Sequence, residues 1–195
     1  MKQPLNPRLP VLLLFIGLAA ALRIANAAHC SPMANFTPLG AMALFGGSYF
    51  SHRWKAFALP LLTLWLSDLV INVGLYKGQF GIMYEGWYWI YGIFALLVWC
   101  GKRLLEQVSV KNVLLASLVA SLSHWLLADT SVWLGGGTDL RTQLPLSRDL
   151  AGWQQCLWQG VPYLRNFLVG TLLYSAVLFG GFEWLQNRYP KLAVA

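Results

Sequence analysis

Charged and amide side chains interrupt several apolar segments of this sequence. A charge inside a bilayer costs about 3 kcal/mol even on the most lenient insertion scale, so such groups are usually kept to bind a solute, relay protons or pair with each other. The chemistry that these residue types favour is hydrogen bonding and charge pairing with a polar organic ligand. We expect one substrate-binding site made of Arg23, Asn26, His29, Asp68, Asn72, Tyr84, Glu85, His124, Asp129 and Arg165.

Catalytic signatures are mostly absent from the sequence. It contains no GxSxG, no HExxH and no pair of Asp-rich motifs. Ser123 and His124 are adjacent, so they point to different sides of a helix and make a poor catalytic pair. The three cysteines show neither CxxC nor metal-site spacing with histidine. We therefore expect no enzymatic activity and no intrinsic cofactor.

The composition indicates which elements must position the polar groups. The chain has 195 residues, of which 57% are hydrophobic and 11% charged, and its mean hydropathy is +0.55, whereas soluble domains carry about 25% charge. We predict an all-α integral membrane protein with a single transmembrane domain, residues 1–195. The net charge of +7 comes from cations scattered between apolar segments, so we interpret them as orientation signals and expect no nucleic-acid partner.

About 20 mainly apolar residues cross a bilayer as a helix, and six windows fit this length. They are residues 9–28, 38–52, 54–75, 82–100, 112–133 and 161–183. The second window is short, begins at Pro38 and is rich in glycine, alanine and serine, which predicts close packing on neighbouring helices instead of lipid on all sides. The first window also resembles a secretory signal that ends in Ala25-Asn26-Ala27, but Arg23 interrupts it, so we keep it as a transmembrane helix.

The basic residues predict the orientation. Nine lie in the N-terminal tail, the second and fourth connections and the C-terminal tail, and four lie on the opposite side: Lys77, Arg141, Arg148 and Arg165. By the positive-inside rule both termini are cytoplasmic, and an even number of spans agrees with their lying on one side. We expect a multi-pass protein of the cytoplasmic (inner) membrane. The long connection 134–160 then lies outside, with the segment around Trp153 and Trp158 resting at the interface.

With this topology the polar residues gather in the outward halves of the helices. Trp65, Asp68 and Asn72 share one face of the third window. The fifth window carries a similar stripe, formed by Ser117, Ser121, His124, Ala128 and Ser131. We infer a polar cup that opens outward above an apolar, tightly packed inner half.

Simpler interpretations of single residues stay open. Asp68 can pair with Arg23 or Arg165 merely to lock the bundle. His124 can be a hydrogen-bonded core histidine. Cys30 and Cys156 would both lie on the outer side, where a disulfide can form in an oxidising compartment.

Three segments carry a resemblance to a known family: Asn35–Phe50, Leu59–Ile71 and Val161–Gly170. The chain, over nearly its whole length, resembles the substrate-binding S-components of energy-coupling-factor vitamin transporters, and among these the solitary BtuM-type cobalamin transporters. The resemblance implies six helices, a vitamin held in an extracytoplasmic pocket, and release to the cytoplasm after a large reorientation in the membrane. Cobalamin or a related corrinoid is the expected cargo.

The resemblance also implies roles for particular residues. His29 and Asp68 match the BtuM-like pocket best. BtuM-type proteins can present a cysteine to the cobalt from the region between helices three and four, but this chain has no cysteine there, so His29 or Met83 becomes the candidate cobalt ligand. In S-components, small residues on helix one contact a transmembrane coupling subunit that works with ATPases. The matching surface here is Gly17, Ala21 and Ala25, unless the protein works alone.

Other functions stay open on the sequence. The chain can be an S-component-like transporter of a different vitamin. It can also be a structural or assembly protein of the membrane, whose small-residue faces bind partner helices. A third alternative is a proton-coupled carrier that uses Glu85 or Asp129.

Overall fold

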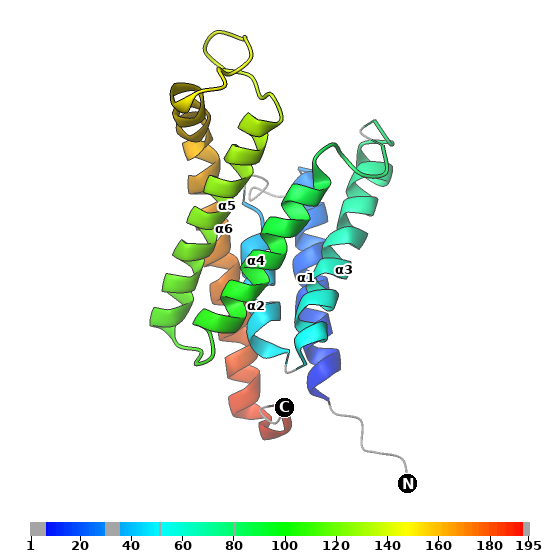
Figure 1. Cartoon of the computed structure of the whole chain (residues 1–195). Coiled ribbons are helices and arrows are strands. Elements are labelled where there is room, and N and C mark those ends of the chain that lie inside the picture. The colour runs from blue at the N-terminus through cyan, green and yellow to red at the C-terminus, as the bar shows by residue number, and fades with distance from the viewer. Residues whose placement is uncertain (1–6, 30–35, 51, 80, 193–195) are drawn as a thin grey trace.

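The computed structural model describes residues 7–29, 36–50, 52–79 and 81–192, and these form a bundle of α-helices (Figure 1). The helices are α1 (Arg8–Ala27), α2 (Leu39–Tyr49), α3 (Arg53–Leu69), α4 (Trp87–Leu104), α5 (Val110–Leu134) and α6 (Leu150–Arg188). A π-helix, Val70–Leu75, continues α3, and a 3₁₀ turn, Pro190–Leu192, follows α6. The described residues contain no β-strand, so the all-α prediction is confirmed for them.

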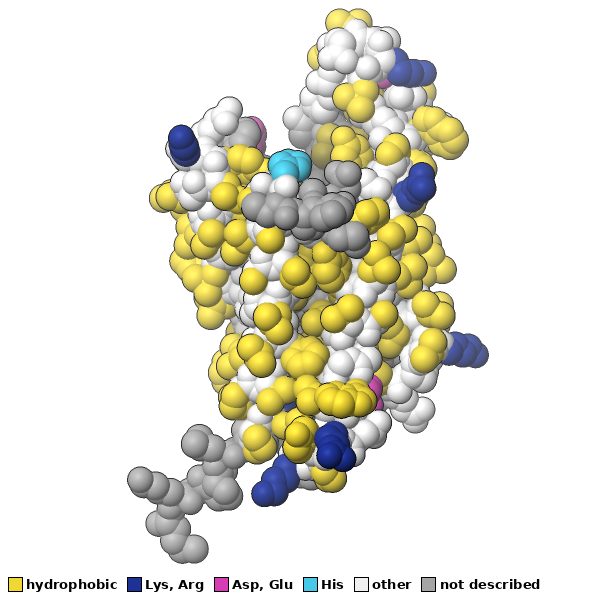
Figure 2. Space-filling model, turned by 180° about the vertical axis from the view of Figure 1, so that it is seen from behind, with side chains coloured by type: hydrophobic (Ala, Val, Ile, Leu, Met, Phe, Trp, Pro, Cys, Tyr) yellow, Lys and Arg dark blue, Asp and Glu magenta, His cyan; other side chains and the backbone are white. Residues whose placement is uncertain are grey.

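Four helices are long and apolar enough to cross a membrane: α1, α3 with its π-helix, α5 and α6. Hydrophobic side chains cover the middle of the face shown in Figure 2, and Lys and Arg side chains lie mainly toward its two ends. This distribution is the one expected for a protein surrounded by lipid. The first residues of α1 and the last residues of α6 lie at the same end of the bundle (Figure 1), where Arg8 Nη1 donates a hydrogen bond to the Leu192 carbonyl. We call this the terminal end.

Two predicted boundaries are wrong. The window 82–100 corresponds to α4, which begins only at Trp87, because Gly86 has a left-handed backbone (φ +75°) that a helix cannot contain. The predicted outer connection 134–160 is mostly helical after residue 149. There the Asp149 carboxylate accepts a hydrogen bond from the Gly152 N–H and caps a helix that runs through Pro162, well before the predicted start at 161.

The short helix α2 lies in the centre of the bundle, as its composition predicts. Its residues from Gly40 to Gly47 are all buried. A Cβ atom on Gly47 would lie 2.1 Å from the Val98 carbonyl oxygen of α4, and one on Gly101 would lie 2.5 Å from the Leu44 carbonyl oxygen of α2. Two backbones touch here, and only glycine permits that approach. The 11 residues of α2 span only about 16 Å, roughly half of a bilayer core.

Aromatic rings fill the terminal end of the bundle around α2. The ring centroid of Phe45 lies between 4.8 and 5.6 Å from those of Phe15, Tyr49, Phe179 and Phe182. This half is tightly packed, as expected, but it is not wholly apolar, because the Arg8 guanidinium lies over the Phe182 ring, 5.9 Å from its centroid. Glu183 of α6 lies among these rings and accepts a hydrogen bond from the Tyr49 hydroxyl.

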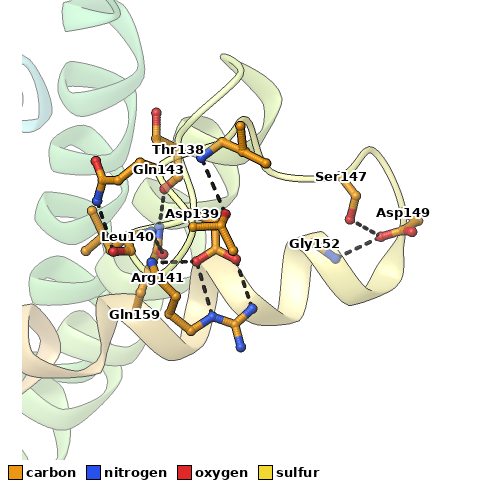
Figure 3. A network of polar contacts seen from close by, with 11 residues as sticks. Thr138, Asp139, Leu140, Arg141, Gln143, Ser147, Asp149, Gly152 and Gln159 are labelled. Carbon is orange, nitrogen blue, oxygen red and sulfur yellow. Dashed lines mark hydrogen bonds and ion pairs between the residues drawn. The ribbon is translucent and has the colours of Figure 1, made fainter.

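At the opposite end, the connection between α5 and α6 is ordered by its own polar contacts (Figure 3). Asp139 accepts hydrogen bonds from the backbone N–H of Arg141 at 2.9 Å and from its guanidinium at 2.9 and 3.2 Å. These bonds hold the pKa of the Asp139 carboxyl below its ordinary value. The Gln159 side chain bonds both to the Leu140 N–H and to the Thr138 carbonyl, which ties the connection to α6.

Candidate ligand-binding cavity

An open cavity of about 530 Å³ lies in the half of the bundle away from the terminal end. Its lining residues are Arg23, Asn26, Ala27, Thr37, Leu39, Asp68, Ile71, Asn72, Tyr76, Tyr84, His124 and Phe167. They come from α1, the start of α2, the end of α3 with its π-helix, the connection to α4, α5 and α6. Because α2 begins only at Leu39 and fills the terminal half, it forms the floor of the cavity and leaves the space above it to a ligand.

The main charged group of the cavity is an ion pair between α1 and α3. Arg23 Nη2 lies 2.5 Å from Asp68 Oδ1, and the Asp68 side chain is only 2% exposed. Arg23 Nη1 also donates to the Ser67 hydroxyl at 2.6 Å, and the Tyr91 hydroxyl of α4 donates to Asp68 Oδ2 at 2.8 Å. Both oxygens of Asp68 are thus occupied, and three helices are joined at this point. Of the two predicted partners of Asp68, the structure selects Arg23 over Arg165.

Two buried amides fix further walls of the cavity. Asn26 Nδ2 donates to the Phe36 carbonyl at 2.7 Å and to the Tyr174 hydroxyl of α6 at 2.9 Å. Asn72 Nδ2 donates to the Ile82 carbonyl at 3.3 Å, which holds the segment before α4 over the end of α3. These bonds fix the positions of the two cavity walls that carry Asn26 and Asn72.

Tyrosine hydroxyls line the mouth of the cavity. Burial and, to a smaller extent, the negative charge of Asp68 together raise the pKa of Tyr84 to about 12. Tyr84 therefore keeps its proton at physiological pH. It offers a ligand a neutral hydroxyl that both donates and accepts hydrogen bonds.

The far wall is aromatic. The imidazole of His124 stacks on the ring of Phe167, with a centroid distance of 4.1 Å and an interplanar angle of 13°. Among the described residues His124 has no hydrogen-bond partner, so the interpretation as a hydrogen-bonded core histidine is wrong for this part of the chain. A flat, unpaired imidazole beside an open space suits contact with a ring-shaped ligand.

A second cavity of about 300 Å³ adjoins the first and shares Thr37, His124 and Phe167 with it. Asp129 lines this second cavity. Its carboxylate lies against the backbone of α6, where a Cβ atom on Gly160 would be 1.8 Å from Oδ2. The two cavities together place one acid on each side of His124: Asp68 in the first and Asp129 in the second.

The structure gathers six of the predicted site residues in the first cavity: Arg23, Asn26, Asp68, Asn72, Tyr84 and His124. Of the other four, Asp129 lines the second cavity and three line neither cavity. His29 is exposed just beyond the end of α1, Glu85 is exposed in the connection before α4, and Arg165 is exposed on α6. Neither candidate cobalt ligand, His29 or Met83, is among the residues that line the first cavity, and the cobalt-ligand assignment stays a prediction.

Other residues were missed or misplaced on the predicted helix faces. The Tyr91 hydroxyl donates a hydrogen bond to Asp68. Tyr91 is one of several aromatic residues in this stretch, and nothing in the sequence distinguishes it from the others. Phe167 follows the polar pair at 165 and 166, and only its stacking on His124 reveals its role. Trp65 was expected on the same face as Asp68 but is 39% exposed, because the buried face of α3 runs through Leu64.

No thiol lines the cavity among the described residues. Cys100 is buried in α4, and the buried Cys156 donates from Sγ to the Asp129 carbonyl at 3.2 Å. Cys30, the other half of the proposed disulfide, lies outside the described residues. The small residues Gly17 and Ala21 are exposed on α1, and a Cβ atom on Gly17 would meet nothing within 4 Å. This surface of α1, with the half-buried Ala25, is open to a partner helix.

The chain belongs to a family of unknown function, DUF6580, whose profile matches residues 3–192. No curated protein and no solved structure matches the chain. The family match covers nearly the whole chain, and the activity has to be argued from the cavity.

Proposed function

We propose that this protein binds a vitamin-sized organic solute in the cavity and mediates its uptake across the cytoplasmic membrane, in the manner of an S-component. Cobalamin or a related corrinoid is the first candidate for the solute. The observation that carries the proposal is the cavity itself, in which an ion pair, two amides and a stacked imidazole converge above a closed floor.

The membrane orientation follows from the ends of the bundle. Exposed tryptophans mark both ends: Trp87, Trp89 and Trp158 at the cavity end, and Trp54, Trp99 and Trp184 at the terminal end. Tryptophan prefers the membrane interface, so the bundle crosses the bilayer between these two levels. The chain then crosses six times, with the short α2 as one of the crossings. Most basic residues of the connections lie at the terminal end, which makes that end cytoplasmic and turns the cavity outward.

The size and lining of the cavity support a small organic ligand. Sites for such ligands usually have volumes of about 300–1,000 Å³ and combine an apolar wall with a few placed polar groups. The cavity of about 530 Å³ meets this description, and its second chamber adds about 300 Å³. A corrinoid, which is larger than a typical small ligand, would fill both chambers and extend through the open mouth.

The residues present fit a corrinoid through amide and ring contacts. Side-chain amides of the vitamin would bond to Arg23, Asn26 and Tyr84, and its flat ring system would lie near His124 and Phe167. His124 replaces His29 and Met83 as the candidate for the cobalt, since it is the imidazole that lines the cavity among the described residues.

Ligand identification after purification tests the proposal. The full-length protein, produced in cells supplied with cobalamin, is expected to carry a corrinoid that is visible by absorbance and identified by mass spectrometry. Asp68→Asn should abolish this binding, because the amide cannot hold Arg23 in place. Asp139→Asn makes the same chemical change in the outer connection, away from the cavity, and should leave binding intact.

Each alternative gives a different result. A bound vitamin other than a corrinoid would keep the fold and the site but change the cargo. If no solute copurifies and none of a panel of vitamins binds the purified protein, the uptake function is wrong and an assembly role takes its place. Equal loss of folding and binding in Asp68→Asn would make the ion pair structural only.

A further inference from the structure

We infer that a basic cavity at the terminal end binds the phosphate headgroup of an anionic phospholipid. This basic cavity has a volume of about 470 Å³ and lies between the end of α2, the start of α3 and the end of α4. It shares no lining residue with the proposed solute site, which lies in the other half of the bundle. The inference therefore goes beyond the proposed function and does not depend on it.

Positive side chains dominate the basic cavity. Arg53 of α3 and Lys102 and Arg103 of α4 line it. The one carboxylate among its lining residues is that of Glu106, which is exposed beyond the end of α4. Within the part of the chain that the structure describes, none of these four side chains forms an ion pair or a hydrogen bond with another residue. The cavity thus keeps an excess of positive charge that no described residue neutralises.

Helix ends and membrane orientation explain these charges only in part. Lys102 and Arg103 lie in the last turn of α4, where the helix dipole favours a cation. Arg53 begins α3, where the dipole disfavours a cation, and the first turn of α3 contains neither an acidic residue nor a side-chain cap. Cations that only orient a helix have to lie on the correct side of the membrane, but they do not have to meet at one cavity. Their convergence indicates a bound anion.

A second layer of the basic cavity is aromatic. On α3, Phe57 lies one turn after Arg53, and on α4, Trp99 lies one turn before Arg103. Because α3 leads away from the terminal end and α4 leads toward it (Figure 1), both rings lie about 6 Å farther from that end than the cations do. This order matches a phospholipid in a membrane, whose charged phosphate lies outside its glycerol and acyl chains.

The depth of the basic cavity also favours a lipid over a free anion. Trp99, which lines it, is 48% exposed, and exposed tryptophan prefers the membrane interface, where phosphate headgroups lie. Basic cavities between transmembrane helices suit anionic headgroups. A free phosphate ion is roughly the size of a few water molecules, at about 30 Å³ each. It would fill a small part of the 470 Å³ and leave the rings without contact.

Binding would join two helices at this end of the bundle. A guanidinium can bond to two phosphate oxygens at once, and an ammonium adds a compact charge. Arg53 comes from α3, and Lys102 and Arg103 come from α4, so one phosphate held by all three spans both helices. The cavity exists only when α3 and α4 are packed together, and a ligand that binds only the folded state stabilises it. A bound lipid should therefore raise the melting temperature.

Lipid binding to the full-length protein in detergent tests the inference. Native mass spectrometry compares phosphatidylglycerol, which is anionic, with phosphatidylcholine, which has the same phosphate but no net charge. The wild type should bind phosphatidylglycerol at least about fivefold more tightly. Arg53→Gln/Lys102→Gln should weaken that binding about 25-fold, because each cation near a headgroup contributes a factor of about five.

The matched control is Lys55→Gln/Arg188→Gln, which also removes one lysine and one arginine from the terminal end. Neither residue lines the basic cavity, and the Lys55 ammonium lies over the Trp54 ring, 5.6 Å from its centroid. This variant should bind phosphatidylglycerol like the wild type. Added phosphatidylglycerol should raise the melting temperatures of the wild type and of the control, but not that of the cavity variant. If the cavity variant does not fold, Arg103→Gln alone should weaken binding about fivefold.

Several results would overturn the inference. Equal affinity for the two lipids would show that the charges select nothing, and equal losses in the two double variants would show that only overall charge matters. Displacement of the lipid by inorganic phosphate would assign the cavity to a free anion. Tighter binding of a poly-glutamate peptide would assign it to an acidic protein segment. Cyanocobalamin binding is measured on the same samples, and its absence would count against the proposed function alone.

Discussion

The ion pair between Arg23 and Asp68 gives the sharpest test of how the cavity is built. Asp68→Asn leaves a guanidinium facing a neutral amide in a place where the acid was only 2% exposed. Removing one partner of a buried pair costs about 3–5 kcal/mol. Arg23 is 16% exposed and borders an open cavity, so water can solvate part of its charge and we expect the lower limit, about 3 kcal/mol.

This loss of stability can be measured as a decrease in the melting temperature. In a protein of this size each kcal/mol shifts the midpoint by about 2–4 °C, so Asp68→Asn should melt about 6–12 °C below the wild type. The double variant Arg23→Gln/Asp68→Asn removes both charges. It should be less destabilised than the sum of the two single variants by about 1–3 kcal/mol, which is the coupling energy of neighbours in contact.

Tryptophan fluorescence during heating of the detergent-purified protein provides the assay, since the chain contains 10 tryptophans. Tyr91→Phe serves as the graded comparison. It removes one hydrogen bond to Asp68 and should cost only about 1 kcal/mol. Strictly additive effects of the Arg23 and Asp68 changes, or a midpoint of Asp68→Asn within about 2 °C of the wild type, would refute the pairing.

Three further changes probe other parts of the bundle. Gly47→Ala should destabilise the protein by about 1–3 kcal/mol or more, because its Cβ would lie 2.1 Å from a carbonyl of α4, whereas Gly180→Ala, with nothing within 4 Å, should be neutral or stabilising in the same thermal assay. Tyr174→Phe should cost about 1 kcal/mol by leaving a buried amide of α1 with one bond fewer. The lowered pKa of Asp139 means that its bonds to Arg141 stabilise the connection between α5 and α6 above the ordinary carboxyl pKa and are lost as the pH falls through the lowered value. The protection of this connection from hydrogen exchange, taken relative to the intrinsic exchange rate at each pH, should therefore fall on acidification, and Asp139→Asn should remove that dependence on pH.

The sequence predicts the general location of the cavity for two reasons, and each applies within a short stretch of chain. Helical periodicity places residues on one face of a helix, and a charge buried in the bilayer costs free energy. Asp68 and Asn72 lie four residues apart, so one face of α3 and its π-helix brings both to the same wall. The small residues of the second window predict its central position, and the glycine contacts at Gly47 and Gly101 are the physical reason. Each of these features depends on residues close together in the chain or on a strong structural preference of one residue type.

The residues that were misplaced lie where the pattern within a single helix no longer determines position. His29 and Glu85 lie next to apolar segments, but in positions where the backbone has already left the helix. Arg165 lies within a helix whose extent the hydropathy pattern underestimated, because Asp149 caps it a full 11 residues before the predicted start (150 against 161). The partnership of Phe167 with His124 depends on the register between two helices, which no pattern within either helix determines.

The packing below the cavity constrains how a bound solute would reach the cytoplasm. The floor is α2, whose aromatic side chains interlock with those of α1 and α6. A passage through the floor would have to separate α2 from α4 at the places where Gly47 and Gly101 bring the two backbones into contact, and would have to part the rings around Phe45. Close-packed interfaces of this kind resist gradual deformation. Movement of the bundle as one body breaks none of these contacts, since it exchanges only the contacts with lipid. A solute held above the closed floor would therefore be released more readily by reorientation of the whole bundle than by a channel opening through it.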